Sequence, residues 1–321
     1  MKLSVFSVLL SDQPLEQALA FLKAQGVQAV EIGCGGYPGK AHCDPAQLLA
    51  DEAKLAAFKA AIKSSGLLLA ALSVHGNAVH PDQAVAKSYH DDFVNAVLLA
   101  EKLGIDRIVT FSGCPGGSAE DKTPNWVTCS WPEDYTAILD YQWNRVLIPY
   151  WKEASAFALS HGVKRIAFEM HPGFCVYNPS TLLRLREAVG GDILGANVDP
   201  SHLFWQGINP VEAIKYLKGA IHYFHAKDTH LDAHNIEVNG VLDIRHYSDP
   251  MRSWVFRTVG YGHDALHWKE IFSTLRSVGY DDVISIEHED ALMSSKEGLT
   301  KAIRFLQDTM IFEQPGEMYW A

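Results

Sequence analysis

The sequence predicts a (β/α)8 barrel, the TIM-barrel fold, as a single domain spanning residues 1–321. Two observations favour this fold class. Eight short apolar runs rich in strand-forming residues alternate with eight longer segments of helical spacing, which is the number of units in a closed barrel. A doubly wound sheet would alternate in the same way, but no GxGxxG motif follows the first run and no break in composition divides the chain.

Each expected strand is a short apolar run, and each expected helix follows one of them. The strands are Leu3–Leu9, Ala29–Ile32, Leu67–Val74, Ile105–Phe111, Val163–Phe168, Ile193–Val198, Ile221–Phe224 and Val283–Ile286. The helices are Pro14–Gln25, Pro45–Ser64, Pro81–Leu103, Pro132–Ser160, Pro179–Ala188, Pro210–Leu217, Leu266–Ser277 and Ser294–Met310. Six of these helices open with proline, whose missing N–H is harmless in a first turn, and several end in glycine, as in AQG and KLG.

Two connections are much longer than the usual few residues. One runs from Ser112 to Trp131 after the fourth strand, and the other runs from Ala226 to Ala265 after the seventh. In a barrel both would lie at the C-terminal rim, where active sites are found. We expect them to be structureless lids or binding loops, and plain surface decoration is the alternative.

Composition excludes several classes of protein. Lys and Arg number 27 against 38 for Asp and Glu, so the net charge is −11, and no basic run is present to bind nucleic acid. No stretch approaches the roughly 20 apolar residues of a membrane span, and segment 1–13 resembles a strand more than a signal peptide. The five cysteines are scattered without a CxxC pair, which argues against a disulfide framework or a cysteine zinc site. We therefore expect a cytoplasmic protein.

Four consecutive strands end in a carboxylate or an imidazole, the side chains that commonly bind metals. Glu169 follows the fifth strand, Asp199 the sixth, His225 the seventh and Glu287 the eighth. A barrel brings these positions together at its top. Three carboxylates without a cation would repel one another and take up protons, so one bound divalent metal explains the cluster. Oxygen-rich ligands with one imidazole suit Mn²⁺, Mg²⁺ or Co²⁺, with Zn²⁺ as a further option. The alternative is four unrelated residues, some of them in salt bridges.

Other polar residues near the strand ends are candidate substrate-binding groups. His171 follows Glu169 by two positions, and it either faces the site or caps its loop. Lys227 and Asp228 alternate in direction, so one should face the site and the other should form a salt bridge outside it. His75 ends the third strand and either binds hydroxyls or supports a loop. The remaining candidates are Glu31, which would bind hydroxyls or orient His75, and Arg257 and His263, which would close over the substrate.

The motifs FEMHPG, NVDPSH, FHAKD and GYGHDALHWKEIFSTLRSVGYDDVISIEHED resemble those of a known family. This is the sugar isomerase/epimerase superfamily of xylose-isomerase-like TIM barrels, which includes D-tagatose 3-epimerase, inosose dehydratase and, more remotely, endonuclease IV. The resemblance implies that Glu169, Asp199, His225 and Glu287 bind one divalent metal, for which we expect Mn²⁺ first and Mg²⁺, Co²⁺ or Zn²⁺ as alternatives. It implies that Glu169 and Glu287 are the catalytic residues and that His202 contacts the substrate. Because members of this family often form dimers or tetramers, a homo-oligomer is a further expectation.

The resulting hypothesis is a metal-dependent isomerase or epimerase of carbohydrate metabolism that acts on a neutral sugar. It would remove a proton next to a carbonyl and pass through a metal-stabilised enediolate. The alternative is a dehydratase or lyase acting on a keto-sugar, an inosose or a 3-keto-glycoside, with His171, His202 or His263 as the acid. Phosphodiester cleavage is disfavoured by the net charge, and a non-catalytic sugar-binding protein by the complete ligand set. Residues 229–259 do not align with the small epimerases, and their role is open.

Overall fold

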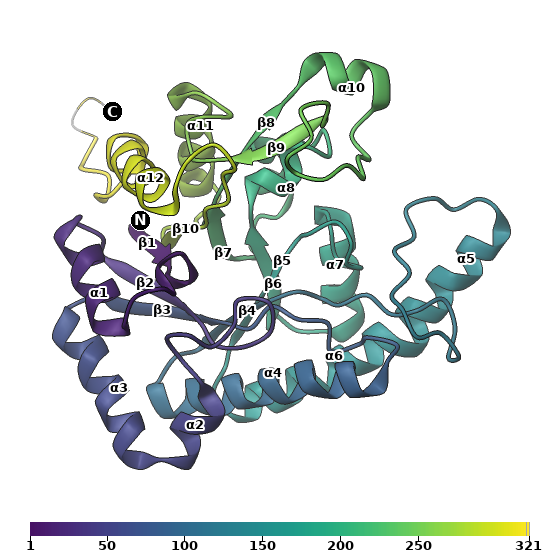
Figure 1. Cartoon of the computed structure of the whole chain (residues 1–321), viewed down its shortest axis with the longest axis horizontal. Helices are drawn as coiled ribbons and strands as arrows, with labels where there is room; N and C mark the ends of the chain where they lie inside the picture. The colour runs from purple at the N-terminus through teal and green to yellow at the C-terminus, as the bar shows by residue number, and fades with distance from the viewer. Residues whose placement is uncertain (319, 321) are drawn as a thin grey trace.

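The computed structural model describes residues 1–318 and 320, so positions 319 and 321 of the predicted domain lie outside the described residues. Eight parallel strands close into a barrel, and helices surround it (Figure 1). Their order around the barrel is β1-β10-β7-β6-β5-β4-β3-β2. The barrel strands are β1 (Lys2–Phe6), β2 (Ala29–Gly33), β3 (Leu68–Ser73), β4 (Arg107–Thr110), β5 (Arg165–Glu169), β6 (Leu194–Val198), β7 (Ile221–Ala226) and β10 (Val283–Ile286).

The eight predicted strands are all present, and the fold prediction is confirmed. The first is shorter than expected, because residues 7–10 form a 3-10 turn rather than strand. Pairing of β1 with β2 stops at Phe6, so the chain beyond it has no neighbouring strand to hold it extended. The turn starts with a buried Ser7 and ends with a buried Leu10.

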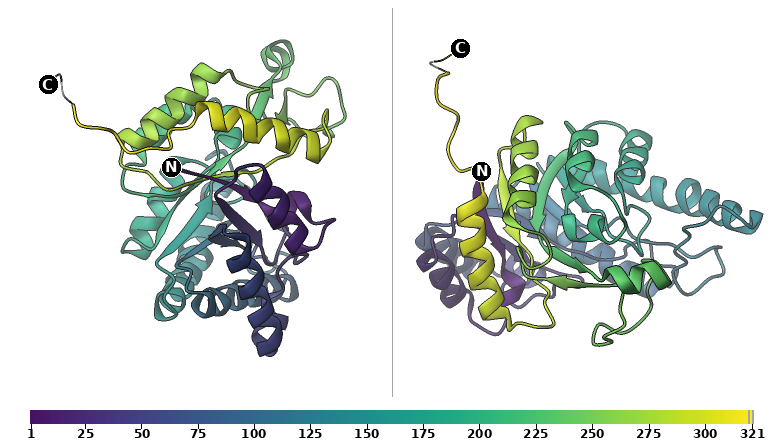
Figure 2. Two further views of the ribbon diagram at one scale, coloured as in Figure 1. Left: turned by 90° about the vertical axis from the view of Figure 1, so that its left-hand side faces the viewer. Right: turned by 90° about the horizontal axis from the view of Figure 1, so that it is seen from above.

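The helices cover the outside of the barrel, as Figure 2 shows from two further sides. Within the described residues, no helix is long and apolar enough to cross a membrane. The helices are α1 (Leu15–Ala24), α2 (Pro45–Ala50), α3 (Glu52–Ser65), α4 (Gln83–Leu103), α5 (Glu133–Asp140), α6 (Ile148–Ser160), α7 (Pro179–Val189), α8 (Pro200–Phe204), α9 (Pro210–Tyr216), α11 (Ala265–Ser277) and α12 (Ser295–Thr309).

Two predicted helices differ in detail from those observed. The segment expected to be one helix over Pro45–Ser64 is divided at Asp51, whose carboxylate caps the start of α3 by accepting from the N–H groups of Ala53 and Lys54. The long helix expected over Pro132–Ser160 contains a π-helical stretch at residues 141–147. The glycines predicted to end helices do adopt positive φ, at Gly26, Gly66, Gly104, Gly162 and Gly279.

The inside of the barrel is unusually polar towards its top. Glu31, Ser73, His225 and Ser285 are completely buried there. Most of the apolar core lies instead between the strands and the surrounding helices, and a smaller cluster of mainly small side chains around Tyr223 fills the lower interior. Burying a charged carboxylate is costly unless it is hydrogen-bonded or paired with a cation. The carboxylate of Glu31 therefore needs partners among the other buried polar groups.

The long segment after β7 is not a structureless loop, which corrects the prediction. It forms β8 (Asp228–Leu231), α10 (Ala233–Asn239) and β9 (Trp254–Arg257), and β8 pairs antiparallel with β9. We call residues 228–257 the β8–β9 arm; in Figure 1 it stands away from the main ring of helices. A separate apolar cluster, including Trp205 and Phe256, anchors it to the barrel. The other long connection, after β4, contains neither helix nor strand from residue 111 to residue 132.

The loop after β2 approaches the loop after β3 very closely at Gly36. Its φ is +64°, and a Cβ added there would lie 1.8 Å from the carbonyl oxygen of His75. We therefore expect Gly36→Ala to lower the free energy of unfolding by roughly 1–3 kcal/mol from the clash, in addition to about 1–2 kcal/mol for the left-handed backbone. Gly39→Ala is the control, since Gly39 has φ +72° but open space around it. Equal midpoints for the two variants in urea unfolding would contradict the close approach.

Candidate metal centre

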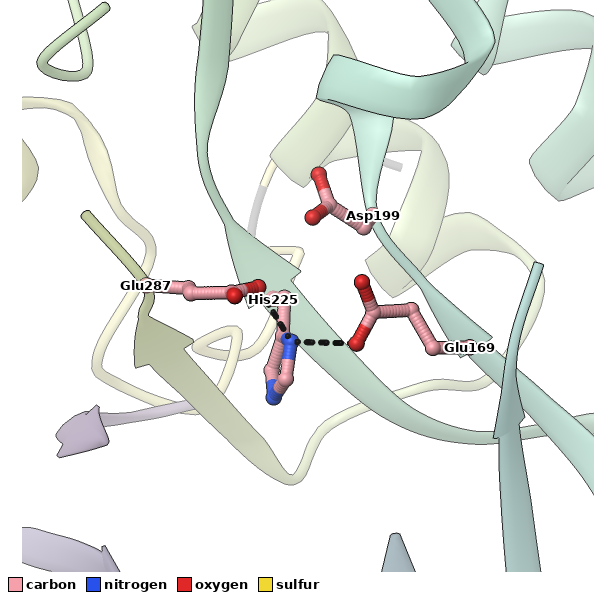
Figure 3. Close-up of side chains that lie close together, drawn as sticks. All are labelled: Glu169, Asp199, His225 and Glu287. Atoms are coloured by element: carbon pink, nitrogen blue, oxygen red, sulfur yellow. Dashed lines mark hydrogen bonds and ion pairs between the residues drawn. The ribbon is translucent and has the colours of Figure 1, made fainter. Parts of the chain in front are cut away.

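Four side chains from four neighbouring strands meet at the top of the barrel. Glu169, Asp199, His225 and Glu287 each offer one ligand atom, and these atoms lie within 4.8 Å of one another. Figure 3 shows the side chains converging from the ends of β5, β6, β7 and β10. The structure thus brings together the four residues that the strand-end pattern singled out.

His225 lies at the centre of this group. Its Nδ1 is 3.0 Å from Glu287 Oε2 and 3.3 Å from Glu169 Oε2 (Figure 3). Asp199 holds the start of α8 through Oδ1, which accepts from the N–H of Ser201 at 2.8 Å. Its second oxygen, Oδ2, is buried and accepts no hydrogen bond among the described residues, although Lys227 Nζ and His202 Nε2 each lie 3.5 Å from it. A bound cation would give this buried oxygen a close partner.

Glu31 positions His225, and this differs from both roles predicted for it. It is completely buried and does not line the cavity that opens above the metal ligands. Its carboxylate oxygens lie 3.0 Å from His225 Nε2. Ser285 donates a 2.6 Å hydrogen bond to the same carboxylate, and Ser73 donates another. Because Glu31 is an acceptor, Nε2 carries a hydrogen and Nδ1 is directed at the other carboxylates. Metal-binding histidines are commonly oriented by a carboxylate in this way.

The charges within the cluster are distributed unequally. Burial raises the pKa of Asp199 to about 8, and the nearby Glu287 and Glu169 add to the rise. Burial also opposes ionisation of Glu287, but Lys227 and His225 outweigh it and lower its pKa to about 2. The pKa of His225 is raised in spite of burial, because Glu31, Glu169 and Glu287 favour its cation. Asp199 thus holds a proton, and His225 carries a positive charge. These two protons supply the two positive charges that a bound dication would otherwise bring to the carboxylates. The residues present fit a divalent metal.

Glu169 is held by two further histidines. Its Oε2 is 2.9 Å from His75 Nε2, and its Oε1 is 2.9 Å from His202 Nε2. His202 was expected to contact the substrate, but its side chain is completely buried, and it does not line the cavity. His202 lies on the short helix α8, which begins directly after Asp199, and this helix directs the imidazole back towards Glu169. His202 therefore positions Glu169.

Lys227 faces the centre and Asp228 points away from it, as their alternation predicted. Lys227 Nζ is 3.3 Å from Glu287 Oε2 and 3.5 Å from Asp199 Oδ2. Asp228 accepts hydrogen bonds from the backbone N–H groups of Gly260, Gly262 and His263, so it holds the loop that follows β9 and does not bind substrate.

Two further predicted substrate contacts, His263 and Arg257, do not line the cavity above the metal ligands. His263 stacks on Phe204 with ring centroids 3.7 Å apart, and its Nδ1 is 2.8 Å from Asp228. Arg257, at the end of the β8–β9 arm, pairs at 3.2 Å with Asp290, which lies in the segment after β10. The sequence places both residues after the seventh strand, but their direction depends on how the arm folds.

A cavity of about 200 Å³ opens above the metal ligands. The predicted residues that line it are His75, Glu169, His171, Lys227 and Glu287. The Nδ1 of His171 is 2.5 Å from the carbonyl oxygen of Pro172, so its Nε2 is the nitrogen left to act on a ligand. Sequence reasoning missed several lining residues. Only Glu289 carried a recognisable signal, as a second carboxylate in the motif IEHED, whereas Phe6, Val8, Tyr37, Pro38 and Phe111 did not.

The chain matches a family model described as xylose isomerase-like TIM barrel over residues 19–309. The chain belongs to this family. A protein of Bacillus subtilis strain 168, YfiH, named as uncharacterised, is 38% identical over 313 residues, which cover 97% of this chain and 99% of YfiH.

Solved structures of the same fold include proteins with different activities. The probable 3-DHS dehydratase AsbF of Bacillus anthracis is 17% identical with a TM-score of 0.65, over 96% of this chain and 99% of that one. A D-psicose 3-epimerase solved in the presence of D-fructose is 14% identical with a TM-score of 0.63, over 97% and 99%. The IolI protein, solved with a zinc atom, is 19% identical with a TM-score of 0.66, over 96% and 98%. The xylose isomerase-like fold thus includes both epimerases and dehydratases.

Proposed function

We propose that this protein is a divalent-metal-dependent sugar isomerase or epimerase. The observation that carries the proposal is the cluster of Glu169, Asp199, His225 and Glu287 beneath a cavity, with both of its glutamates lining that cavity. A divalent ion held by these residues would polarise a sugar carbonyl and stabilise the enediolate that forms when the neighbouring carbon loses its proton.

The protein side chains would move the proton. Glu169 and Glu287 line one cavity, and each has a carboxylate oxygen within reach of a ligand there. One glutamate would take the proton from the carbon beside the carbonyl, and the other would return a proton to the opposite face. His75 and His202 would fix the orientation of Glu169 through their 2.9 Å contacts. Acid–base transfer of this kind contributes roughly 10²–10⁴-fold to a rate.

The charge balance favours a neutral sugar over a sugar phosphate. Three ligand carboxylates and one dication leave a single negative charge, which Lys227 offsets. Lys227 is the one Lys or Arg among the lining residues, and its ammonium is already shared among Asp199, Glu287 and Glu289 at 3.3–3.5 Å. A phosphate would therefore find no uncommitted cation among the residues that line the cavity.

A dehydratase acting on a keto-sugar is the second candidate, and His171 favours it. Its imidazole lines the cavity but is not one of the four candidate ligands. Burial lowers the pKa of His171, so its Nε2 would be neutral when substrate binds. Such a group could accept the proton first and then protonate a departing hydroxyl.

The experiment is proton NMR of keto-sugars in D₂O with the Mn²⁺-loaded protein. We expect deuterium to enter a carbon next to the carbonyl. An epimer carrying deuterium would identify an epimerase, an aldose–ketose pair an isomerase, and an unsaturated product a dehydratase. Absence of exchange from every ketohexose, inosose and 3-keto-glycoside, with the metal bound at one ion per chain, would contradict enediolate chemistry.

Glu31 offers a test of the metal site that does not depend on turnover. We expect Glu31→Gln to weaken Mn²⁺ binding about 10–100-fold in calorimetric titration, because the carboxylate that orients His225 loses its charge. Glu101→Gln is a suitable control, since Glu101 lies on the exposed side of α4. Equal affinities in the two variants would show that Glu31 does not support a metal ligand.

A further inference from the structure

A second cavity lies beside the metal cluster, between the β8–β9 arm and the segment after β10. Its inner part has a volume of about 250 Å³, and its lining includes Tyr247, Phe256 and Glu289. Its outer part, of about 460 Å³, continues along the arm past Trp254 to Leu292. We call the two parts together the arm groove. The minimal barrel does not require it, because it exists only where the arm is inserted.

The arm groove adjoins the cavity above the metal ligands. Glu289 lines both. Phe256 forms the wall between the arm groove and the metal cluster. On the inner side, Lys227 Nζ lies 4.6 Å from the centre of its ring, and the ring of His202 is 5.3 Å away. On the outer side, the Tyr247 ring stacks on it at 5.9 Å. A molecule that is held at the metal and is longer than one ring would therefore extend into the arm groove.

The two arginines along the arm groove already have partners. The Arg252 guanidinium lies 4.1 Å from the centre of the Tyr247 ring and donates to the carbonyl oxygen of Trp254 at 2.9 Å. Arg257 is paired with Asp290. What remains for a ligand is the exposed part of the Tyr247 side chain, which is 48% exposed, together with the carboxylate of Glu289 at the junction, which also pairs with Lys227. An aromatic side chain with a few hydrogen-bonding groups suits an uncharged ring that carries hydroxyls.

We propose that the arm groove binds a second, uncharged ring of the substrate, joined through a glycosidic oxygen to the sugar that reacts at the metal. This inference rests on the proposed function and narrows its substrate class. Where the reacting sugar is the glycosyl unit, its anomeric carbon is blocked as an acetal, and its carbonyl then lies at another carbon such as C3. A ketone at C3 has acidic hydrogens at C2 and C4. In epimerisation the proton that leaves C2 is replaced at the same carbon, so no other reactant is consumed.

The first test measures binding without turnover. Trehalose and methyl α-D-glucoside share one α-glucosyl ring, and trehalose adds a second. We expect trehalose to bind about tenfold more tightly in calorimetric titration, since one aromatic–ring contact contributes on that scale. Tyr247→Ala should remove this preference, and Tyr247→Phe, which keeps the ring, should retain it. The matched control is Tyr261→Ala, because Tyr261 is similarly exposed but lines neither cavity.

The second test compares kcat/KM for deuterium exchange on the 3-keto derivatives of trehalose, phenyl α-D-glucoside and methyl α-D-glucoside. We expect the first to be preferred over the last by about tenfold in the unmodified protein and in Tyr247→Phe, but not in Tyr247→Ala. A preference for the phenyl glycoside of similar size would identify the second ring as any flat uncharged group. A preference for the trehalose derivative alone would identify it as a sugar.

The outcomes separate this inference from the proposed function. Equal affinities and equal exchange rates for one-ring and two-ring ligands would overturn the second-ring site while leaving enediolate chemistry established. Tighter binding of trehalose 6-phosphate than of trehalose would overturn the assignment of an uncharged ring. If exchange fails on every substrate, the proposed function falls, and the binding preference with its dependence on Tyr247 still decides whether the arm groove holds a second ring.

Discussion

Replacing Glu287 by Gln is expected to slow solvent deuterium exchange about 10²–10⁴-fold for one of two sugar epimers and far less for the other. Glutamine keeps the size and one oxygen of the side chain, but it cannot take up a proton. In a two-base epimerase each glutamate serves one face of the sugar. Glu169→Gln should therefore show the opposite preference between epimers. The measurement is NMR exchange in D₂O from each epimer separately.

Glu212→Gln is the matched control for these variants, because Glu212 is exposed on α9 and pairs with Lys215. Metal content must be measured for each variant, since both glutamates are also candidate ligands. Loss of exchange from both epimers in one variant, with one metal still bound, would indicate a single base and favour the dehydratase. Unchanged exchange in both variants would remove Glu169 and Glu287 from the mechanism.

Metal removal is expected to have the next largest effect. Protein stripped with a chelator should lose exchange, and adding Mn²⁺ to about one hundred times its Kd should raise the free energy of unfolding by about 2.7 kcal/mol. For a chain of 321 residues that corresponds to a rise in Tm of roughly 1.5 °C per kcal/mol, or about 4 °C in all. Asp199→Asn should abolish the rise. Its stability without metal should change little, because Asn can also cap α8.

Asp12→Asn is the control for this comparison, since Asp12 is exposed and distant in sequence from the strand ends. It should show the same rise in Tm with Mn²⁺ as the unmodified protein. A rise in Asp199→Asn equal to that of the control would show that Asp199 is not a ligand. Repeating the titration with Mg²⁺, Co²⁺ and Zn²⁺ in thermal unfolding would rank the metals.

Much of the site was predictable because it depends on local patterns. A buried strand is visible in the sequence as a short apolar run. In a parallel barrel, the residues at the carboxyl ends of all the strands lie at the same rim. Glu169, Asp199, His225 and Glu287 could thus be chosen without knowing any contact between them. The alternation that directs one of Lys227 and Asp228 inward and the other outward is also a local property of extended backbone, but it does not say which of them faces the site.

The sequence by itself determined the eight strand–helix units, the single domain and the four residues that converge at the rim. Only the tertiary structure decided what those residues contact. The bond from Glu31 to His225 joins positions 194 residues apart, and it depends on how the closed barrel staggers its strands. The packing of the β8–β9 arm buries His202 and forms the arm groove. It also leaves Arg257 and His263 outside the cavity above the metal ligands. Packing of this kind is set by complementary surfaces distant in sequence, which no local pattern records.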